Sequence, residues 1–262
     1  MIRHFFKRLQ ISHILRRHAI PQHLWHSVCE ELHLLQNLTV VEKTRLRELS
    51  TLFLRNKVIT GVDLQISDRM RVIVAAQACL PVLDLGTDLL EGWRQIVIYP
   101  DAFRVSRDEP DQDGIVHHED RVLSGEAWSR GPVIFSWGDI EQDIRHFQEG
   151  HNVIVHEIAH KLDMRNGRAN GMPPLHAAMQ TAAWTEAFSA AYERLEQRLE
   201  HHQRVCVNPY AATSPAEFFA VFSEYFFTAP EILHSHFPAV HEQLRLYYRQ
   251  DPLQRGLSLS GR

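Results

Sequence analysis

The sequence has few cysteines and no long apolar run, and each shortage excludes a class of protein. Its three cysteines, Cys29, Cys79 and Cys206, are odd in number and far apart, so neither a disulfide framework nor a cysteine-rich zinc ribbon is expected. No apolar stretch approaches the roughly 18–20 residues that a helix needs to span a bilayer. We therefore expect a protein of the reducing cytoplasm without a transmembrane segment.

An excess of positive charge is also absent. The chain carries 28 Lys and Arg against 32 Asp and Glu, a formal net charge of −4, whereas a nucleic-acid-binding protein needs surplus cations to meet phosphates. Direct binding of nucleic acid is therefore not expected. Residues 1–20 also lack the uninterrupted apolar segment of a signal peptide, because basic side chains are scattered through them.

Apolar side chains and histidine are plentiful. Hydrophobic residues make up 44% of the 262 residues and charged residues 23%, which is typical of a folded soluble protein rather than a disordered one. The 18 histidines outnumber the 6 tyrosines and 5 tryptophans together. Because histidine is the commonest metal ligand, this excess directs attention to metal-binding patterns.

Hydrophobic periodicity predicts an α+β fold that is mostly helical with a small central sheet. Residues 21–56 look helical, with a second helix starting at the Thr39–Glu42 capping box, and residues 105–120 read as a loop or hairpin tip. We expect one domain over residues 1–262 with a helical region over about residues 1–90. The further expected helices are 68–80, 151–165, 175–203, 214–227 and 237–250, and the expected strands are 95–99, 121–124 and 132–137.

The pattern His-Glu-x-x-His occurs once, at residues 156–160, in an otherwise apolar helical segment. Residues four apart on a helix face the same way, so His156 and His160 can both reach one zinc ion. Glu157 is turned away by about 100° and can instead reach a metal-bound water, which is the position of a general base. The alternative is a buried helix with two hydrogen-bonded histidines and an exposed glutamate.

A catalytic zinc needs a third protein ligand. The extended pattern that ends in a third histidine fails here, because Asp163 and Asn166 stand where Gly and His are required. Glu217 and Glu224 are the candidates, since they are seven residues apart and project from one face of an aromatic-rich helix. Whichever is not the ligand would orient a ligating histidine. For Glu217 the alternative role is a capping carboxylate after Ser214.

Four segments together resemble the Mlc titration factor A (MtfA) family of gluzincin-type zinc metallopeptidases. They are residues 156–165 (HEIAHKLDMR), 210–217 (YAATSPAE), 222–227 (FSEYFF) and 251–255 (DPLQR). The resemblance extends over nearly the whole chain and is far more specific than the histidine pattern alone.

The resemblance implies one Zn²⁺ per chain, with His156, His160 and Glu217 as ligands and Glu157 as catalytic base. It also implies that Tyr210 donates a hydrogen bond in the transition state, where the residues alone allow a surface tyrosine. It further implies a zincin-like core akin to the catalytic domain of anthrax lethal factor, aminopeptidase-like activity on a peptide substrate, and binding of Mlc, the repressor of glucose-uptake genes. Two alternatives stay open: a repressor-sequestering binding protein with a vestigial or regulatory zinc site, and a purely structural metal.

Weaker signals concern three other segments. Residues 132–137 are either a sheet edge for an extended substrate or a core strand. Residues 117–119 (HHE) resemble a metal motif but lie in a polar stretch, which favours a solvated surface. The first residues of the chain could form a basic amphipathic helix that contacts a membrane, a partner or the protein body.

Overall fold

The computed structural model describes residues 11–101, 103–110, 116–123, 125–127 and 131–255. From residue 103 to residue 127 it describes the backbone alone. The amphipathic helix expected at the N-terminus falls largely in residues 1–10, outside the described residues. The HHE motif at residues 117–119 lies in a strand whose side chains are not described.

Helices dominate the N-terminal part, as predicted. Residues 11–18 are helical, and α2 (Gln22–Glu31), α3 (His33–Gln36), α4 (Val40–Asn56) and α5 (Asp68–Cys79) follow. The capping box forms: the Thr39 backbone N–H donates to Glu42 Oε2 at 2.8 Å, and the Glu42 N–H donates to Thr39 Oγ1 at 3.2 Å. The expected boundary at Thr39 is therefore confirmed.

The described residues include a four-stranded sheet in the order β1 (Val58–Gly61), β2 (Gln95–Tyr99), β6 (Val133–Ser136) and β5 (Gly125–Ala127). The first three strands are parallel, and β5 pairs antiparallel with β6. Because β6 lies between β2 and β5, the hypothesis that residues 132–137 form a sheet edge is wrong. The edge on this side is β5, which lies between the expected strands 121–124 and 132–137 and was not predicted.

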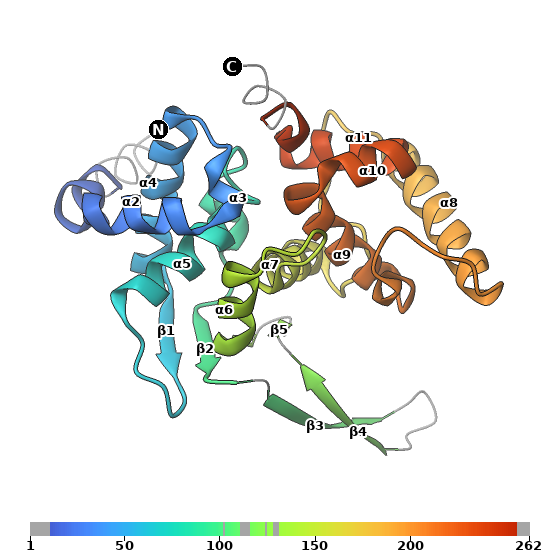
Figure 1. Ribbon diagram of the computed structural model, residues 1–262, viewed down its shortest axis with the longest axis horizontal. Coiled ribbons are helices and arrows are strands. Elements are labelled where there is room, and N and C mark those ends of the chain that lie inside the picture. Colours follow the sequence, from blue (N-terminus) through green and yellow to red (C-terminus); the bar gives the residue numbers. More distant parts are fainter. Residues whose placement is uncertain (1–10, 102, 111–115, 124, 128–130, 256–262) are drawn as a thin grey trace.

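Two further strands, on either side of residues 111–115, form a second sheet. β3 (Phe103–Pro110) and β4 (Val116–Leu123) pair antiparallel along eight residues each. Figure 1 shows this hairpin extending away from the main sheet. The stretch expected as a loop or hairpin tip is thus mostly two hairpin strands, and the strand expected at residues 121–124 is the end of β4.

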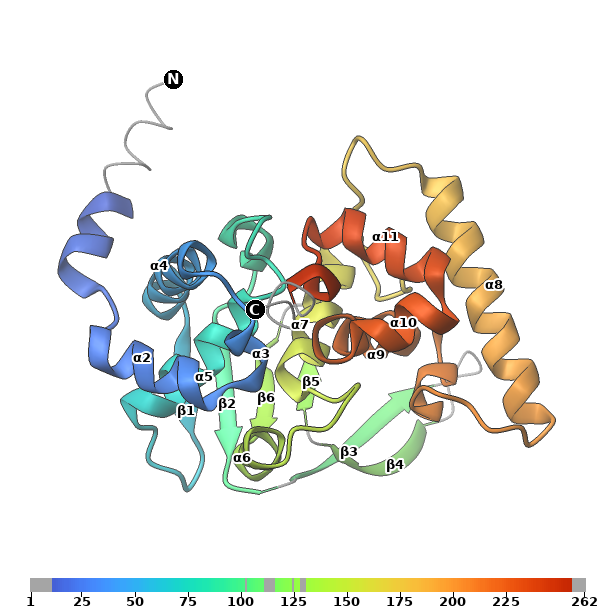
Figure 2. The same ribbon diagram turned by 45° about the horizontal axis from the view of Figure 1, so that its top comes forward.

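The C-terminal part is helical and contains the helices that matter for the site. Helix α7 (Val153–Asp163) packs against β5 and β6 on one side and against α9 (Pro215–Thr228) on the other (Figure 2). The expected helix at 175–203 begins only at residue 181, and a short helix precedes the expected one at 237–250. The remaining elements are η1 (Thr87–Leu90), α6 (Trp137–Arg145), η2 (Met164–Asn166), α8 (Thr181–Glu200), η3 (Pro209–Ala212), α10 (Pro230–His236) and α11 (Pro238–Tyr248).

The core is continuous through both parts of the molecule. Helix α9 is buried over nearly its whole length, and its phenylalanines pack edge-on or stacked against rings from α8 and α11. No helix among the described residues is long and apolar enough to cross a membrane. The mostly helical α+β architecture with a small sheet is confirmed, and α7 occupies its centre.

Candidate metal centre and active site

Helix α7 carries the two histidines because its sequence buries the rest of its surface. Six apolar residues of this helix are buried, whereas His156 and His160 keep 14% and 12% of their side chains exposed. The helix begins at Asn152, whose side-chain Oδ1 accepts a hydrogen bond from the Val155 N–H at 2.8 Å. The predicted helical spacing is confirmed: the two imidazole centroids lie 4.8 Å apart.

Helix α9 supplies both candidate glutamates. Ser214 caps the helix by accepting from the Glu217 backbone N–H at 3.2 Å, and Pro215 occupies the first turn. The Glu217 carboxylate, however, contacts the histidines of α7. Its Oε2 lies 3.0 Å from His156 Nε2 and 3.2 Å from His160 Nε2.

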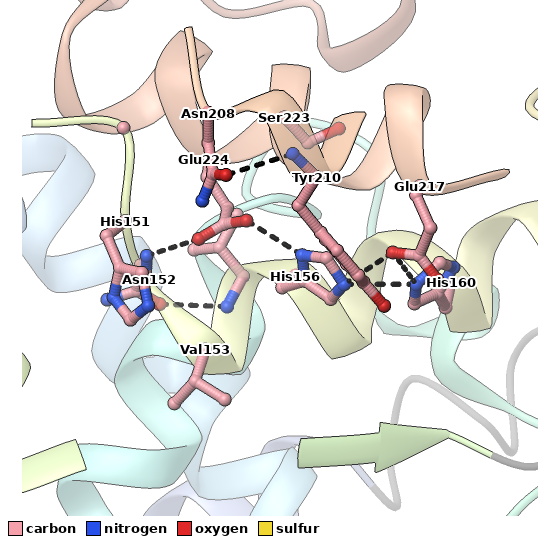
Figure 3. A network of polar contacts seen from close by, with 12 residues as sticks. His151, Asn152, Val153, His156, His160, Asn208, Tyr210, Glu217, Ser223 and Glu224 are labelled. Carbon is pink, nitrogen blue, oxygen red and sulfur yellow. Dashed lines mark hydrogen bonds and ion pairs between the residues drawn. The ribbon is translucent and has the colours of Figure 1, made fainter. Parts of the chain in front are cut away.

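Three donor atoms therefore converge on one point, as Figure 3 shows. His156 Nε2 and His160 Nε2 are 3.1 Å apart, which closes a triangle with Glu217 Oε2. Ligand atoms about 2.0–2.1 Å from a tetrahedral zinc ion lie about 3.3 Å from one another, so the donor set fits zinc in type and spacing. Within the described part of the chain, this is the one group of three or more His, Cys, Asp or Glu residues that could hold a metal ion.

Glu224 lies on the other side of the same imidazole. Its Oε1 is 2.7 Å from His156 Nδ1, and its Oε2 accepts a hydrogen bond from the Asn152 backbone N–H at 2.6 Å. Its side chain is 6% exposed, against 20% for Glu217. The geometry thus separates the two glutamates: Glu217, the ligand that the resemblance implies, faces both Nε2 atoms, and Glu224 faces Nδ1.

The electrostatics of this group call for a cation. Burial alone would raise the pKa of Glu217, but its hydrogen bonds with His156 and His160 outweigh burial and hold that pKa below its usual range. Burial opposes protonation of His156, yet the charge of Glu224 and the bond to Glu217 raise the His156 pKa well above its usual value. Positive charge between these side chains is therefore favourable, and either a proton or a metal ion can supply it.

Glu157 lies beside the two histidines but forms no part of the triangle. It is only 4% exposed, and its Oε2 is buried with no hydrogen-bond partner among the described residues. Burial raises its pKa, and the neighbouring charges of His156 and His160 partly offset this. The structural alternative of an exposed glutamate is wrong, because this carboxylate is buried with an oxygen left over.

Tyr210 reaches the site from η3, just before α9. Asn208 Oδ1 accepts from the Tyr210 backbone N–H at 3.0 Å and so fixes the turn. Tyr210 is 41% exposed, and the centroid of its ring lies 6.2 Å from that of His156. Figure 3 shows the side chain extending toward the histidines. Tyr210 is thus a surface residue that also borders the site.

Asp163 shares a helical stripe with the histidines but faces a different group. Its Oδ2 accepts hydrogen bonds from the Asn170 and Gly171 backbone N–H groups at 2.8 and 2.7 Å. Gly171 has φ +78°, and a Cβ there would lie 2.4 Å from the carbonyl oxygen of Pro215. The loop after α7 thereby packs tightly against the start of α9, which places Glu217 near His160.

Sequence reasoning missed Asn152. An asparagine directly before an apolar helical segment is a common N-cap signal, so its capping role was visible. Its other contacts were not, because Gln77 and Glu224 lie 75 and 72 residues away in the chain. No local pattern indicates such pairings.

Comparison with known proteins gives consistent matches. Residues 6–249 match the model of the family described as glucose-regulated metallo-peptidase M90. The protein named Mlc titration factor A from Salmonella arizonae is 42% identical over 230 residues, which covers 85% of this chain and 89% of that protein. The proteins of that name from Salmonella typhimurium and Klebsiella pneumoniae are 40% and 39% identical over 228 and 225 residues, with 84–85% of each chain covered.

Proposed function

Because the chain belongs to the glucose-regulated metallo-peptidase family M90, we propose that it is a zinc-dependent peptidase of the gluzincin type. One zinc ion per chain is held by His156, His160 and Glu217. The convergence of these three donor atoms, with the buried carboxylate of Glu157 beside them, is the observation that carries the proposal. A purely structural zinc is usually closed by four protein ligands and has no need of an adjacent base.

The bound zinc ion supplies Lewis acidity, which activates water near neutral pH and polarises a carbonyl oxygen. The protein's own residues perform the proton transfers. Glu157 accepts a proton from the attacking water and later delivers it to the leaving amine. Its buried setting and its unpartnered Oε2 suit this role, since this oxygen meets no other hydrogen-bond donor among the described residues.

Tyr210 donates a hydrogen bond from its hydroxyl to the oxyanion that develops on the scissile carbonyl. Its position beside His156 on a turn fixed by Asn208 supports this role. Tyr210 is 41% exposed, so it borders the site on the side that faces solvent.

The substrate is a peptide bound in extended form. Strand β5 is the antiparallel edge of the sheet and packs against α7, so its backbone offers a row of hydrogen-bonding groups next to the candidate metal centre. Aminopeptidase-like cleavage rests on the family resemblance alone.

A second function is binding of an Mlc-like transcription repressor in the cytoplasm. Its support is the 39–42% identity to proteins named Mlc titration factor A over most of the chain. The alternative, a repressor-binding protein with a vestigial zinc site, does not explain why Glu157 is retained next to a complete donor set.

Glu157→Gln tests the proposal, since glutamine is nearly isosteric but cannot accept the proton. Zinc content, hydrolysis of a peptide library and capture of the repressor are measured on one preparation, with the exposed Glu200→Gln on α8 as matched control. We expect the Glu157→Gln variant to keep its zinc and to lose hydrolysis by a factor on the order of 10²–10⁴. Full hydrolysis by this zinc-loaded variant would overturn the role of Glu157. Repressor capture that survives places the partner outside the cleft.

A further inference from the structure

A chain of buried polar contacts runs from α5 through the start of α7 to His156. Gln77 Oε1 accepts a hydrogen bond from Asn152 Nδ2 at 2.6 Å. The Asn152 backbone N–H donates to Glu224 Oε2 at 2.6 Å, and Glu224 Oε1 pairs with His156 Nδ1 at 2.7 Å. Figure 3 shows the part of this chain from Asn152 to His156.

Gln77 is conspicuous because its surroundings are apolar. From residue 72 to residue 79 every position of α5 is buried, and Gln77 is the one polar side chain among them. It is only 2% exposed. A buried amide is costly unless it is hydrogen-bonded, so a glutamine at this position needs a specific partner, and the structure gives it Asn152.

Both polar atoms of the Asn152 side-chain amide are hydrogen-bonded. Its Oδ1 accepts from the Val155 N–H, and its Nδ2 donates to Gln77. With the side chain held in this way, the backbone N–H of Asn152 has a set direction, and that direction is toward Glu224. A helix cap alone would require only the first of these contacts, which serine provides equally well.

The orientation of Glu224 then decides the state of His156. A carboxylate facing Nδ1 holds the proton of neutral imidazole on that nitrogen and leaves the lone pair on Nε2, the atom that faces Glu217 and His160. If Glu224 turned away, the proton could move to Nε2, where it would block a metal ion.

We propose that Asn152, anchored by Gln77, is a positioning residue for the metal centre. It orients the carboxylate of Glu224 against Nδ1 of His156 and thereby keeps Nε2 of His156 directed at the metal position. This inference rests on the proposed zinc-binding function. It also means that the N-terminal helical part contributes to the site through the buried side chain of Gln77 on α5.

Two variants each remove the hydrogen bond between Asn152 and Gln77, here called the link. Asn152→Ser keeps a capping hydroxyl for α7 but removes the donor to Gln77. Gln77→Leu has a similar size and removes the acceptor. Tyr248→Phe is the matched control, because it removes a buried hydrogen bond to Ser223, on the same helix as Glu224. It changes none of the polar contacts between Gln77 and His156. Each protein is also unfolded in urea to record its loss of stability.

The first readout needs no metal. The metal-free protein is studied at a pH high enough for the His156 imidazole to be neutral, since its carboxylate partners outweigh burial and raise its pKa. At that pH, ¹⁵N chemical shifts of the ring report which nitrogen carries the proton. We expect the Nδ1–H form in the wild type and in Tyr248→Phe, and a mixture of both forms in Asn152→Ser and Gln77→Leu. Unchanged His156 shifts in both link variants would overturn the inference.

The second readout is the zinc dissociation constant, measured by competition with a chromogenic chelator. Loss of an outer contact typically weakens metal binding 10–100-fold, so we expect roughly a 10-fold increase for either link variant and no change for Tyr248→Phe. The double variant should be no weaker than the weaker single one, because both break the same link. Equal weakening in Tyr248→Phe would mean that general loss of stability, and not positioning, is responsible.

The proposed zinc binding and the positioning role of Asn152 can be contradicted by separate results. A wild type that binds no zinc contradicts the proposed function, while the ring shifts still test the link. A wild type that binds zinc with an affinity matched by both link variants contradicts the positioning role alone.

Discussion

The two sides of the His156 ring differ in what surrounds them. On the Nε2 side, His160 and Glu217 present acceptor atoms within 3.2 Å of one another, partly open to solvent. On the Nδ1 side, Glu224 is buried and each of its carboxylate oxygens meets a nitrogen. Both glutamates come from one face of α9, so residue type and helix position do not distinguish them.

The two sides differ in compensating charge. The lack of a positive charge between the ligand atoms on the Nε2 side, and not the type of residue, defines the candidate metal centre. A buried carboxylate with two nitrogens facing its oxygens is already compensated. Three donor atoms that face one another need a cation. This supports the proposed roles of Glu217 as a ligand and of Glu224 as the residue that orients His156. The four variants below are ordered by the size of the change that each should cause.

The largest effect is expected on the Nε2 side, from Glu217→Ala. Removing a direct ligand should weaken zinc binding by more than about 100-fold, above the usual cost of losing an outer contact. Chelator competition measures this, with Glu231→Ala on α10 as control for removing an acid from the first turn of a helix. Zinc binding that survives in Glu217→Ala would remove this residue from the ligand set.

Tyr210→Phe should act on turnover and not on zinc. The hydroxyl is proposed to contact only the developing oxyanion, so kcat should fall by roughly 10²-fold or more, the scale of losing one oxyanion donor. Peptide hydrolysis and zinc content are measured together. Unchanged turnover with zinc still bound means that Tyr210 takes no part in the reaction.

Glu224→Gln tests the Nδ1 side. The amide keeps the shape of the side chain but loses the charge that holds the proton on Nδ1 of His156. We expect zinc to bind about 10–100-fold more weakly, a smaller change than for Glu217→Ala. If Glu224→Gln releases the metal and Glu217→Ala does not, the assignment of the two glutamates is reversed.

Thr39→Ala gives the smallest effect and a baseline far from both sides. It removes the capping box of α4, so the free energy of unfolding should fall by about 1 kcal/mol. Urea unfolding measures the loss, and zinc affinity should not change. A change in zinc affinity here would show that any destabilisation perturbs the metal centre, and the contrast between the two sides would lose its meaning.

Local patterns predicted the parts of the fold that local interactions determine. The capping box at Thr39, helix α7 and helix α9 follow from residue spacing within a few turns. Strands β1 and β5 were missed because they are four and three residues long and are defined by pairing with distant strands. Helix α10 was missed because seven residues between two prolines give too little periodicity.

In the candidate site, too, some features follow from local spacing and others depend on how distant helices pack. The spacing of His156 and His160 predicted that both imidazoles lie on one face of α7, as a candidate metal-binding helix requires. The choice between Glu217 and Glu224 depends on how α9 packs on α7, since both project from one face. The contact between Asn152 and Gln77 depends on how α5 packs on α7, and no pattern in either segment indicates the other.

The most direct test of the account is a crystal structure of the zinc-loaded protein with anomalous diffraction recorded on both sides of the zinc absorption edge. The account predicts one anomalous peak per chain, bonded to Nε2 of His156, Nε2 of His160 and a carboxylate oxygen of Glu217, with Glu224 still against Nδ1 of His156. A zinc ion bonded to Glu224, or no zinc between the two histidines, would contradict it.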